Sequence, residues 1–190
     1  MNRRNLLLLA FAAAVAVQLA VPAWMIAGRE LTMRAGKLFK FKTRPVDPVD
    51  AFRGRYVWLG LEPGAVMVPD AKKWRTNQKV FAVLGTDSNG FAMVNRLERA
   101  MPAGGEASVK VRVQWSDIYK NEVRIGWPGL DRYYMTEKKA PEAEKAYWDH
   151  NVRTNRGCHV TVRVRGGSAV IENLFIEDKP VSDWLNENKK

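Results

Sequence analysis

The sequence predicts a mainly β (α+β) protein with an N-terminal transmembrane helix. One antiparallel β-rich domain of barrel or sandwich type should follow, with one packed α-helix near 141–152. Three observations predict this class. The chain opens with an apolar run as long as a membrane-spanning helix. Beyond residue 30, apolar and polar residues alternate with a period of two, as in half-buried strands. After Pro141 the spacing of the apolar residues becomes helical.

The opening run extends from Leu6 to Ala27 and is interrupted only by Gln18 and Pro22. As a helix it would rise about 33 Å, enough to cross a hydrocarbon core of about 30 Å. We therefore expect residues 1–28 to form an uncleaved transmembrane anchor. The alternative is a cleaved signal peptide ending near Val21-Pro22-Ala23, although the apolar part of such a peptide normally has only about 7–15 residues.

Basic residues flank this run on both sides, and the two flanks predict opposite orientations of the anchor in the membrane. Arg3 and Arg4 precede the run, which is typical of an anchor whose N-terminus stays inside the cell. More basic residues follow it, and a literal count would keep the domain in the cytoplasm. We expect the first pattern to prevail, so that the domain faces outward. The group that follows the run consists of Arg29, Arg34, Lys37, Lys40, Lys42 and Arg44.

The net charge of +11 is concentrated near the anchor. Residues 29–55, read as a basic juxtamembrane strand and a Pro/Asp turn, hold eight basic and three acidic side chains. Beyond residue 55, the single β-rich domain expected over 29–190 is nearly balanced in charge. Each juxtamembrane Lys or Arg contributes about 1 kcal/mol near an anionic surface, so we expect the six basic residues after the anchor to contact the membrane surface.

Strands are predicted where apolar and polar residues alternate. Over 109–115 the valines and Trp115 should face the core, and the intervening residues form a basic outer face. Over 158–165 the same alternation points His159 and every second residue after it toward solvent. Segment 38–42 repeats the pattern, with its two phenylalanines facing inward.

Short turn signals separate further strands and predict that sequence neighbours pair antiparallel. A helix of about three turns is predicted over 141–152, where Pro141 suits the first helical position. A shorter helix is expected over 181–187. The three predicted hairpins pair 79–85 with 91–98, 107–118 with 122–127, and 158–165 with 169–177.

Residues 45–61 read Pro-Val-Asp-Pro-Val-Asp-Ala-Phe-Arg-Gly-Arg-Tyr-Val-Trp-Leu-Gly-Leu. This segment resembles the signature of the bacterial GDYXXLXY family of membrane-anchored proteins. Arg55 and Leu61 depart from it, replacing an acidic residue and the last tyrosine. The likeness continues at 133–135 and 169–180. The residues that match the signature are Asp47, Pro48, Gly54, Tyr56 and Leu59.

The resemblance implies a location and an architecture. The family has no established activity, so no catalytic residues carry over to this chain. The expected location is the bacterial inner membrane, with the domain in the periplasm. Members of the family tend to be encoded beside multi-pass membrane proteins, which implies a multi-pass membrane protein as the partner.

The residues of the motif themselves allow two interpretations. As a turn leading into a strand, the segment would place Val57, Leu59 and Leu61 in the core. As a binding surface, the same segment would offer a ligand or partner the side chains of Arg53, Arg55, Tyr56 and Trp58.

Few residues suggest catalysis. Cys158 and His159 are adjacent, so a strand sends them to opposite faces, and we expect Cys158 to be a buried packing residue. His150 should be a hydrogen-bonded packing residue of the helix. With two His, one Cys and no ligand-spaced motif, neither a metal site nor a cofactor is expected. None of the five serines lies in a GxSxG motif, which leaves an envelope hydrolase of Ser–Lys type as one alternative.

A second alternative is a polymer- or single-stranded nucleic-acid-binding domain, in which basic strand faces lie beside aromatic side chains. Acidic residues are interspersed throughout, so nucleic acid is not the favoured partner. We expect instead a non-catalytic binding or assembly partner of an integral membrane protein, with no prediction of oligomeric state. The candidates for nucleic-acid contact are Lys110, Arg112, Arg163, Arg165, Trp74 and Trp127.

Overall fold

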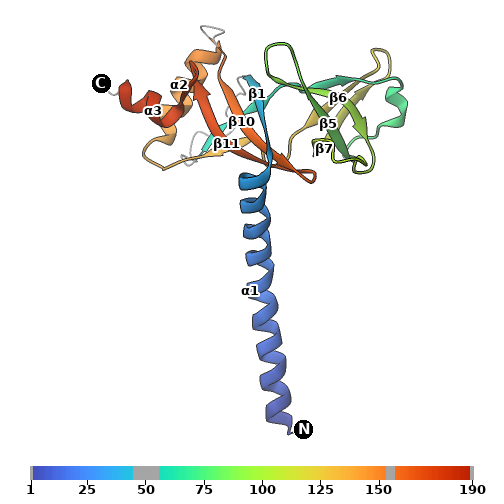
Figure 1. Ribbon diagram of the computed structural model, residues 1–190, viewed down its shortest axis with the longest axis vertical. Coiled ribbons are helices and arrows are strands. Elements are labelled where there is room, and N and C mark those ends of the chain that lie inside the picture. The colour runs from blue at the N-terminus through green and yellow to red at the C-terminus, as the bar shows by residue number, and fades with distance from the viewer. Residues whose placement is uncertain (1, 45–55, 153–156, 189–190) are drawn as a thin grey trace.

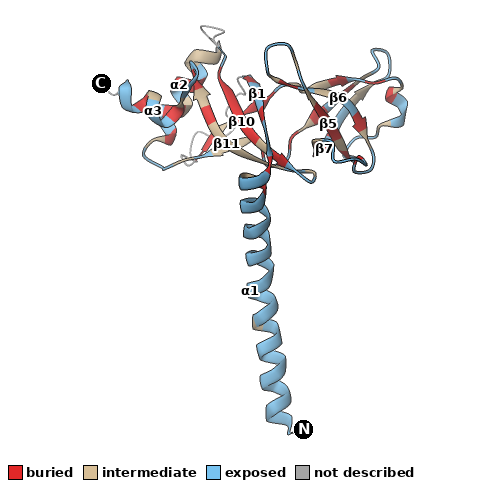
Figure 2. Ribbon diagram, viewed as in Figure 1, coloured by how far each residue is buried: buried red, intermediate tan, exposed pale blue. Residues whose placement is uncertain are grey.

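The computed structural model describes residues 2–44, 56–152 and 157–188. Helix α1 (Arg3–Ala35) extends away from a head that contains all the other elements (Figure 1). The side chains of α1 are exposed along almost its whole length, whereas the buried residues gather in the head (Figure 2). Within the described ranges, α1 is the one helix long and apolar enough to cross a membrane.

Helix α1 continues beyond the anchor that the sequence predicts. It ends at Ala35 rather than near residue 28, because residues 29–35 contain neither Gly nor Pro, the strongest helix breakers. Glu30 and Arg34 form an ion pair of 2.7 Å at the i, i+4 spacing, which supports the added turns. The first residues of the expected juxtamembrane strand are therefore helical.

Among the described residues, the head contains two five-stranded antiparallel sheets and a two-stranded ribbon. The order in the first sheet is β12 (Lys179–Pro180), β11 (Ser168–Ile176), β10 (His159–Arg165), β1 (Lys37–Arg44) and β3 (Gly60–Leu61). The order in the second is β4 (Ala65–Met67), β8 (Glu122–Gly126), β7 (Ser108–Asp117), β5 (Lys79–Thr86) and β6 (Ala92–Glu98). The ribbon pairs β2 (Tyr56–Trp58) with β9 (Arg132–Tyr134), and a short 3₁₀ helix η1 (Ala71–Lys73) precedes β5.

All three predicted hairpins are confirmed, as β5–β6, β7–β8 and β10–β11. The second sheet curls so that its edge strands β4 and β6 approach each other, giving a nearly barrel-shaped unit (Figure 1). Both predicted helices are also present. Helix α2 (Ala140–Val152) packs Ala143 and Tyr147 inward, and α3 (Val181–Glu187) buries Val181 and Leu185.

The two sheets share one apolar core. Phe41 of β1 is fully buried, and its ring meets that of Trp127 edge to face at a centroid distance of 5.1 Å. Two parallel bridges also join the sheets, one from Lys40 to Phe91 and one from Val109 to Gly167. The first bridge brings the β5–β6 turn against β1, and the second brings the β10–β11 turn against β7.

Three predicted side-chain orientations are wrong. Trp115 is 49% exposed, because a bulge between Val113 and Trp115 shifts its register with β8. His159 and Thr161 are buried although the alternation pointed them to solvent. The β5–β6 turn folds over this face and brings the Phe91 ring to a centroid distance of 6.0 Å from that of His159. On the neighbouring strand β11, the Phe175 ring stacks on His159 at 4.8 Å.

Candidate functional site

Helix α1 joins the head at Gly36 without an intervening linker. The Gly36 N–H donates to the Thr32 carbonyl at 2.9 Å, and Arg163 Nη1 donates to the Gly36 carbonyl at 3.3 Å. The same guanidinium pairs with Glu172 at 3.0 Å. A Cβ on Gly36 would collide with the Thr32 carbonyl oxygen and lie 3.0 Å from the backbone nitrogen of Val164. The direction of α1 relative to the first sheet is therefore set by close backbone packing.

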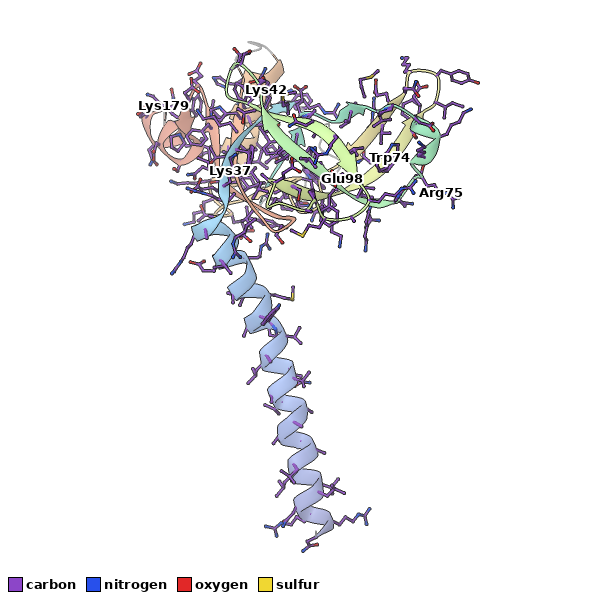
Figure 3. All side chains as sticks on the ribbon, turned by 45° about the vertical axis from the view of Figure 1, so that its right-hand side comes forward. Lys37, Lys42, Trp74, Arg75, Glu98 and Lys179 are labelled. Atoms are coloured by element: carbon purple, nitrogen blue, oxygen red, sulfur yellow. The ribbon has the colours of Figure 1, made fainter. Side chains whose placement is uncertain are left out.

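In the structure, the six basic residues that follow the apolar run fall into two groups. The first three lie on the last turns of α1 or at the first residue of β1. Strand β1 then leads across the head, so that Lys37 lies beside α1 and Lys42 lies at the far side (Figure 3). There the Lys42 ammonium lies 4.8 Å from the centroid of the Phe91 ring. The near group is Arg29, Arg34 and Lys37, and the group along β1 is Lys40, Lys42 and Arg44.

The described part of the family motif lies in the core. Tyr56, Val57, Leu59 and Leu61 are all buried, with exposed fractions of at most 8%. These residues fit the interpretation of a turn leading into core strands. Five residues named from the sequence lie outside the described ranges, namely Asp47, Pro48, Arg53, Gly54 and Arg55.

One cationic and aromatic cluster surrounds the motif, and Arg132 of β9 lies at its centre. Its guanidinium carbon lies 5.1 Å from the ring centroid of Tyr56 and 4.6 Å from that of Trp58. A hydrogen bond with Tyr134 raises the pKa of Arg132 above its usual value. The Trp58 indole N–H is buried without a partner among the described residues. Stacked Arg and aromatic side chains suit recognition of another molecule, but they supply no nucleophile.

Sequence reasoning missed Arg132 and Tyr134 as members of this cluster. Strand β9 has only three residues, too few to display an alternation. Its pairing with β2 also joins positions far apart in the chain, Tyr56 with Tyr134. The one available signal was that 133–135 resembles a segment of the same family as the motif.

Cys158 and both histidines are packing residues. Burial raises the pKa of the Cys158 thiol to about 12, so the thiol stays neutral and unreactive at neutral pH. Burial also lowers the pKa of His159, whose Nδ1 lies 3.7 Å from Asp178. His150 Nδ1 lies 2.8 Å from the Ala146 carbonyl oxygen, which confirms its expected hydrogen-bonded role. No group of three or more His, Cys, Asp or Glu side chains placed to hold a metal occurs in the part of the chain that the structure describes.

The residues proposed for hydrolysis and for nucleic-acid contact do not converge. No serine in the described ranges hydrogen-bonds a lysine, and the Ser108 hydroxyl is buried without a partner there. Trp127 is buried and donates its indole N–H to the Pro63 carbonyl at 3.2 Å, so it offers no stacking surface. Arg163 is committed to Glu172, whereas Lys110 and Arg112 remain exposed on β7.

Comparisons with known proteins point to one family. A search of curated proteins gives no significant match, and a search of solved structures gives none either. The family model described as GDYXXLXY protein matches residues 18–174, which include the apolar end of α1 and most of the head. The match extends over more than half of the chain and agrees with the resemblance seen at residues 45–61. The chain therefore belongs to the GDYXXLXY family.

Proposed function

We propose that this chain is a single-pass protein of the bacterial inner membrane that assembles with an integral membrane partner and has no catalytic role. The observation that carries the proposal is the linker-free junction at Gly36. A head held in one orientation can present a fixed surface to a partner in the same bilayer. Such preorganisation lowers the entropy cost of association.

The head belongs on the periplasmic side in this proposal. Arg3 and Arg4 form a short basic segment before the apolar run, the usual format of an anchor with its N-terminus inside. The later basic residues Lys40, Lys42 and Arg44 lie on a strand of the folded head. Long domains are translocated largely regardless of their charge, so we give the basic segment before the run more weight than the count after it.

The apolar part of α1 offers a surface for a partner helix. Gln18 lies near the middle of the run, and its carboxamide has no hydrogen bond to any described residue. Ala14 lies one turn earlier on the same face, where a small side chain permits close approach of helices. In hydrocarbon, an interhelical hydrogen bond from such an amide contributes about 0.6–2 kcal/mol. A second helix would satisfy this amide better than lipid does.

The Arg132 cluster is the proposed contact on the head. Tyr134 is 66% exposed at its edge, and the cluster combines the residue types that dominate protein interfaces. A contact in the bilayer and another on the head would act together, because the close packing at Gly36 couples α1 to the head in this proposal. The partner is accordingly expected to be a multi-pass protein with a domain or loop on the same side of the membrane.

The proposal is tested by affinity purification of tagged full-length chain from native membranes. We expect one multi-pass protein to co-purify in stoichiometric amount. Ala14→Leu and Gln18→Leu should each lower its recovery about fivefold, the equivalent of about 1 kcal/mol. Ala16→Leu is the matched control, because residue 16 lies on the opposite face of the helix from residue 18.

Two results would contradict the proposal. One is the absence of any stoichiometric membrane partner. The other is equal recovery of the partner with Ala14→Leu, Gln18→Leu and Ala16→Leu. A reporter fused to the C-terminus separately tests the side of the membrane, and we expect it to be active only in the periplasm.

A further inference from the structure

A hollow of about 400 Å³ lies beside α1, where the helix meets the head. Its walls come from α1, from the neighbouring strands β5 and β7, and from the β10–β11 turn, which hydrogen-bonds β7 through the Gly167 carbonyl and the Lys110 N–H at 2.9 Å. The hollow thus forms only when the two sheets and the helix come together. Its basic lining residues are Arg29, Lys79, Lys110 and Arg112, and no acidic residue lines it.

The positive charges of this basic hollow are not compensated within the described residues. None of its four basic side chains forms an ion pair there. Other basic residues of the head do find carboxylates. Arg96 pairs with Glu98 at 2.6 Å, and Arg163 pairs with Glu172 at 3.0 Å. The basic hollow therefore gathers four basic side chains, with no carboxylate among its described lining residues to offset their charge.

The strand register places these basic side chains close enough to destabilise the sheet by charge repulsion. Lys79 of β5 lies directly opposite Arg112 of β7 in the antiparallel pair, and Lys110 is the next residue of β7 on the same face. Like charges directly opposite one another destabilise a sheet. An anion bound between them would remove this repulsion and would accept hydrogen bonds from several donors.

The position of the basic hollow along α1 indicates where the anion comes from. Arg29 lies two residues beyond Ala27, where the apolar run ends. Two helical residues rise about 3 Å, and the polar headgroup layer on each side of the hydrocarbon is about 5–8 Å deep. When α1 spans a bilayer, Arg29 therefore lies at the level of the lipid phosphates. The β10–β11 turn lies beside the upper end of α1 (Figure 1), and it lines the same hollow as Arg29 and β7.

We propose that the basic hollow binds the phosphate of an anionic phospholipid from the bilayer around α1. Arg112 can hold two phosphate oxygens at once, while Lys79, Lys110 and Arg29 neutralise the charge from the sides. The inference requires α1 to span the membrane, but it does not require the partner helix proposed above. A bound lipid would attach the head to the bilayer at a second point besides α1.

The test measures binding of a short-chain phosphatidylglycerol to the full-length chain in neutral detergent by titration calorimetry. Replacing Lys79, Lys110 and Arg112 together with Gln should weaken binding about 100-fold, from about 1 kcal/mol for each basic residue. A matched triple variant replaces Lys72, Lys120 and Lys145 with Gln, which removes the same charge from exposed sites elsewhere. It should weaken binding less than about twofold.

Equal losses in the two triple variants would overturn the proposal, as would unchanged binding in both. Inorganic phosphate, used as a competitor, should displace the lipid only weakly. If it bound as tightly as the lipid, the site would be one for soluble phosphate and the lipid assignment would be wrong. None of these measurements involves the protein partner, so the proposed assembly can fail while this inference stands.

Lys79→Gln alone supplies a further readout. It should weaken lipid binding about fivefold. Without lipid, its urea unfolding midpoint should be unchanged or raised, because the substitution relieves the repulsion from Arg112. A lowered midpoint would contradict the repulsion inferred from the strand register.

Discussion

Replacing Gly36 with Ala should disturb the junction between α1 and the head. The added Cβ would collide with the Thr32 carbonyl oxygen and crowd the backbone nitrogen of Val164 at 3.0 Å. Both neighbours are backbone atoms, so a side-chain rotation cannot relieve the contact. Overpacking of this kind costs about 1–3 kcal/mol, and loss of the hydrogen bond from Gly36 to Thr32 adds about 1 kcal/mol. We expect the unfolding free energy of the head to fall by about 2–4 kcal/mol, or less where α1 tilts to relieve the contact.

The tilt can be measured directly with two spin labels in the full-length chain in lipid nanodiscs. One label replaces Leu31 on α1 and the other replaces Ser88 in the β5–β6 turn, both exposed positions. Gly36→Ala should broaden or shift the distribution of distances between the labels. Gly28→Ala is the matched control, since a Cβ there meets nothing within 4 Å. If Gly36→Ala and Gly28→Ala gave the same distance distribution and the same unfolding free energy, the junction would not be rigid.

Three further predictions concern the core of the head. The unfolding free energy should fall as pH drops below about 6.5, because burial lowers the pKa of His159 in the folded state and the unfolded chain takes up the proton first. In urea titrations at a series of pH values, His159→Gln should lose the fall in unfolding free energy that protonation of His159 causes. If His159→Gln and the unsubstituted chain showed the same dependence of unfolding free energy on pH, the role of His159 would be refuted. Phe41→Ala should cost about 3–5 kcal/mol in urea unfolding, since Phe41 is fully buried against Trp127, whereas a cost below about 1 kcal/mol would be inconsistent with this packing. The Cys158 thiol should react with a water-soluble maleimide only after unfolding, and rapid labelling of the folded chain would refute its burial.

Local patterns in the sequence predicted most of the regular structure. The strand over 38–42 and the three hairpins follow from alternation and turn residues, signals that lie within about ten residues of each other. The helix over 141–152 follows from Pro141 and the helical spacing after it. In these segments the local preference and the final packing agree, so the prediction needed no knowledge of the rest of the chain.

Features that depend on contacts between distant segments could not be predicted in the same way. His159 is buried because the β5–β6 turn folds over its face, and no pattern around residue 159 reveals this contact. Trp115 is exposed because one extra residue enters β7 opposite β8. The basic hollow brings Arg29, Lys79 and Gly167 together from three separate parts of the chain. Charge counting identified Arg29 but gave no reason to associate it with β5.

We expect α1 to hold the head in one orientation, with the basic hollow facing the bilayer. The most direct test uses fluorescent labels on the full-length chain in vesicles whose headgroups carry a quencher. Ser168→Cys places a label at the basic hollow, and Ser88→Cys places one in the β5–β6 turn at the far side. We predict strong quenching at position 168 and little at position 88. Equal quenching at the two positions would show that the head rotates freely above the membrane and that α1 does not fix its orientation.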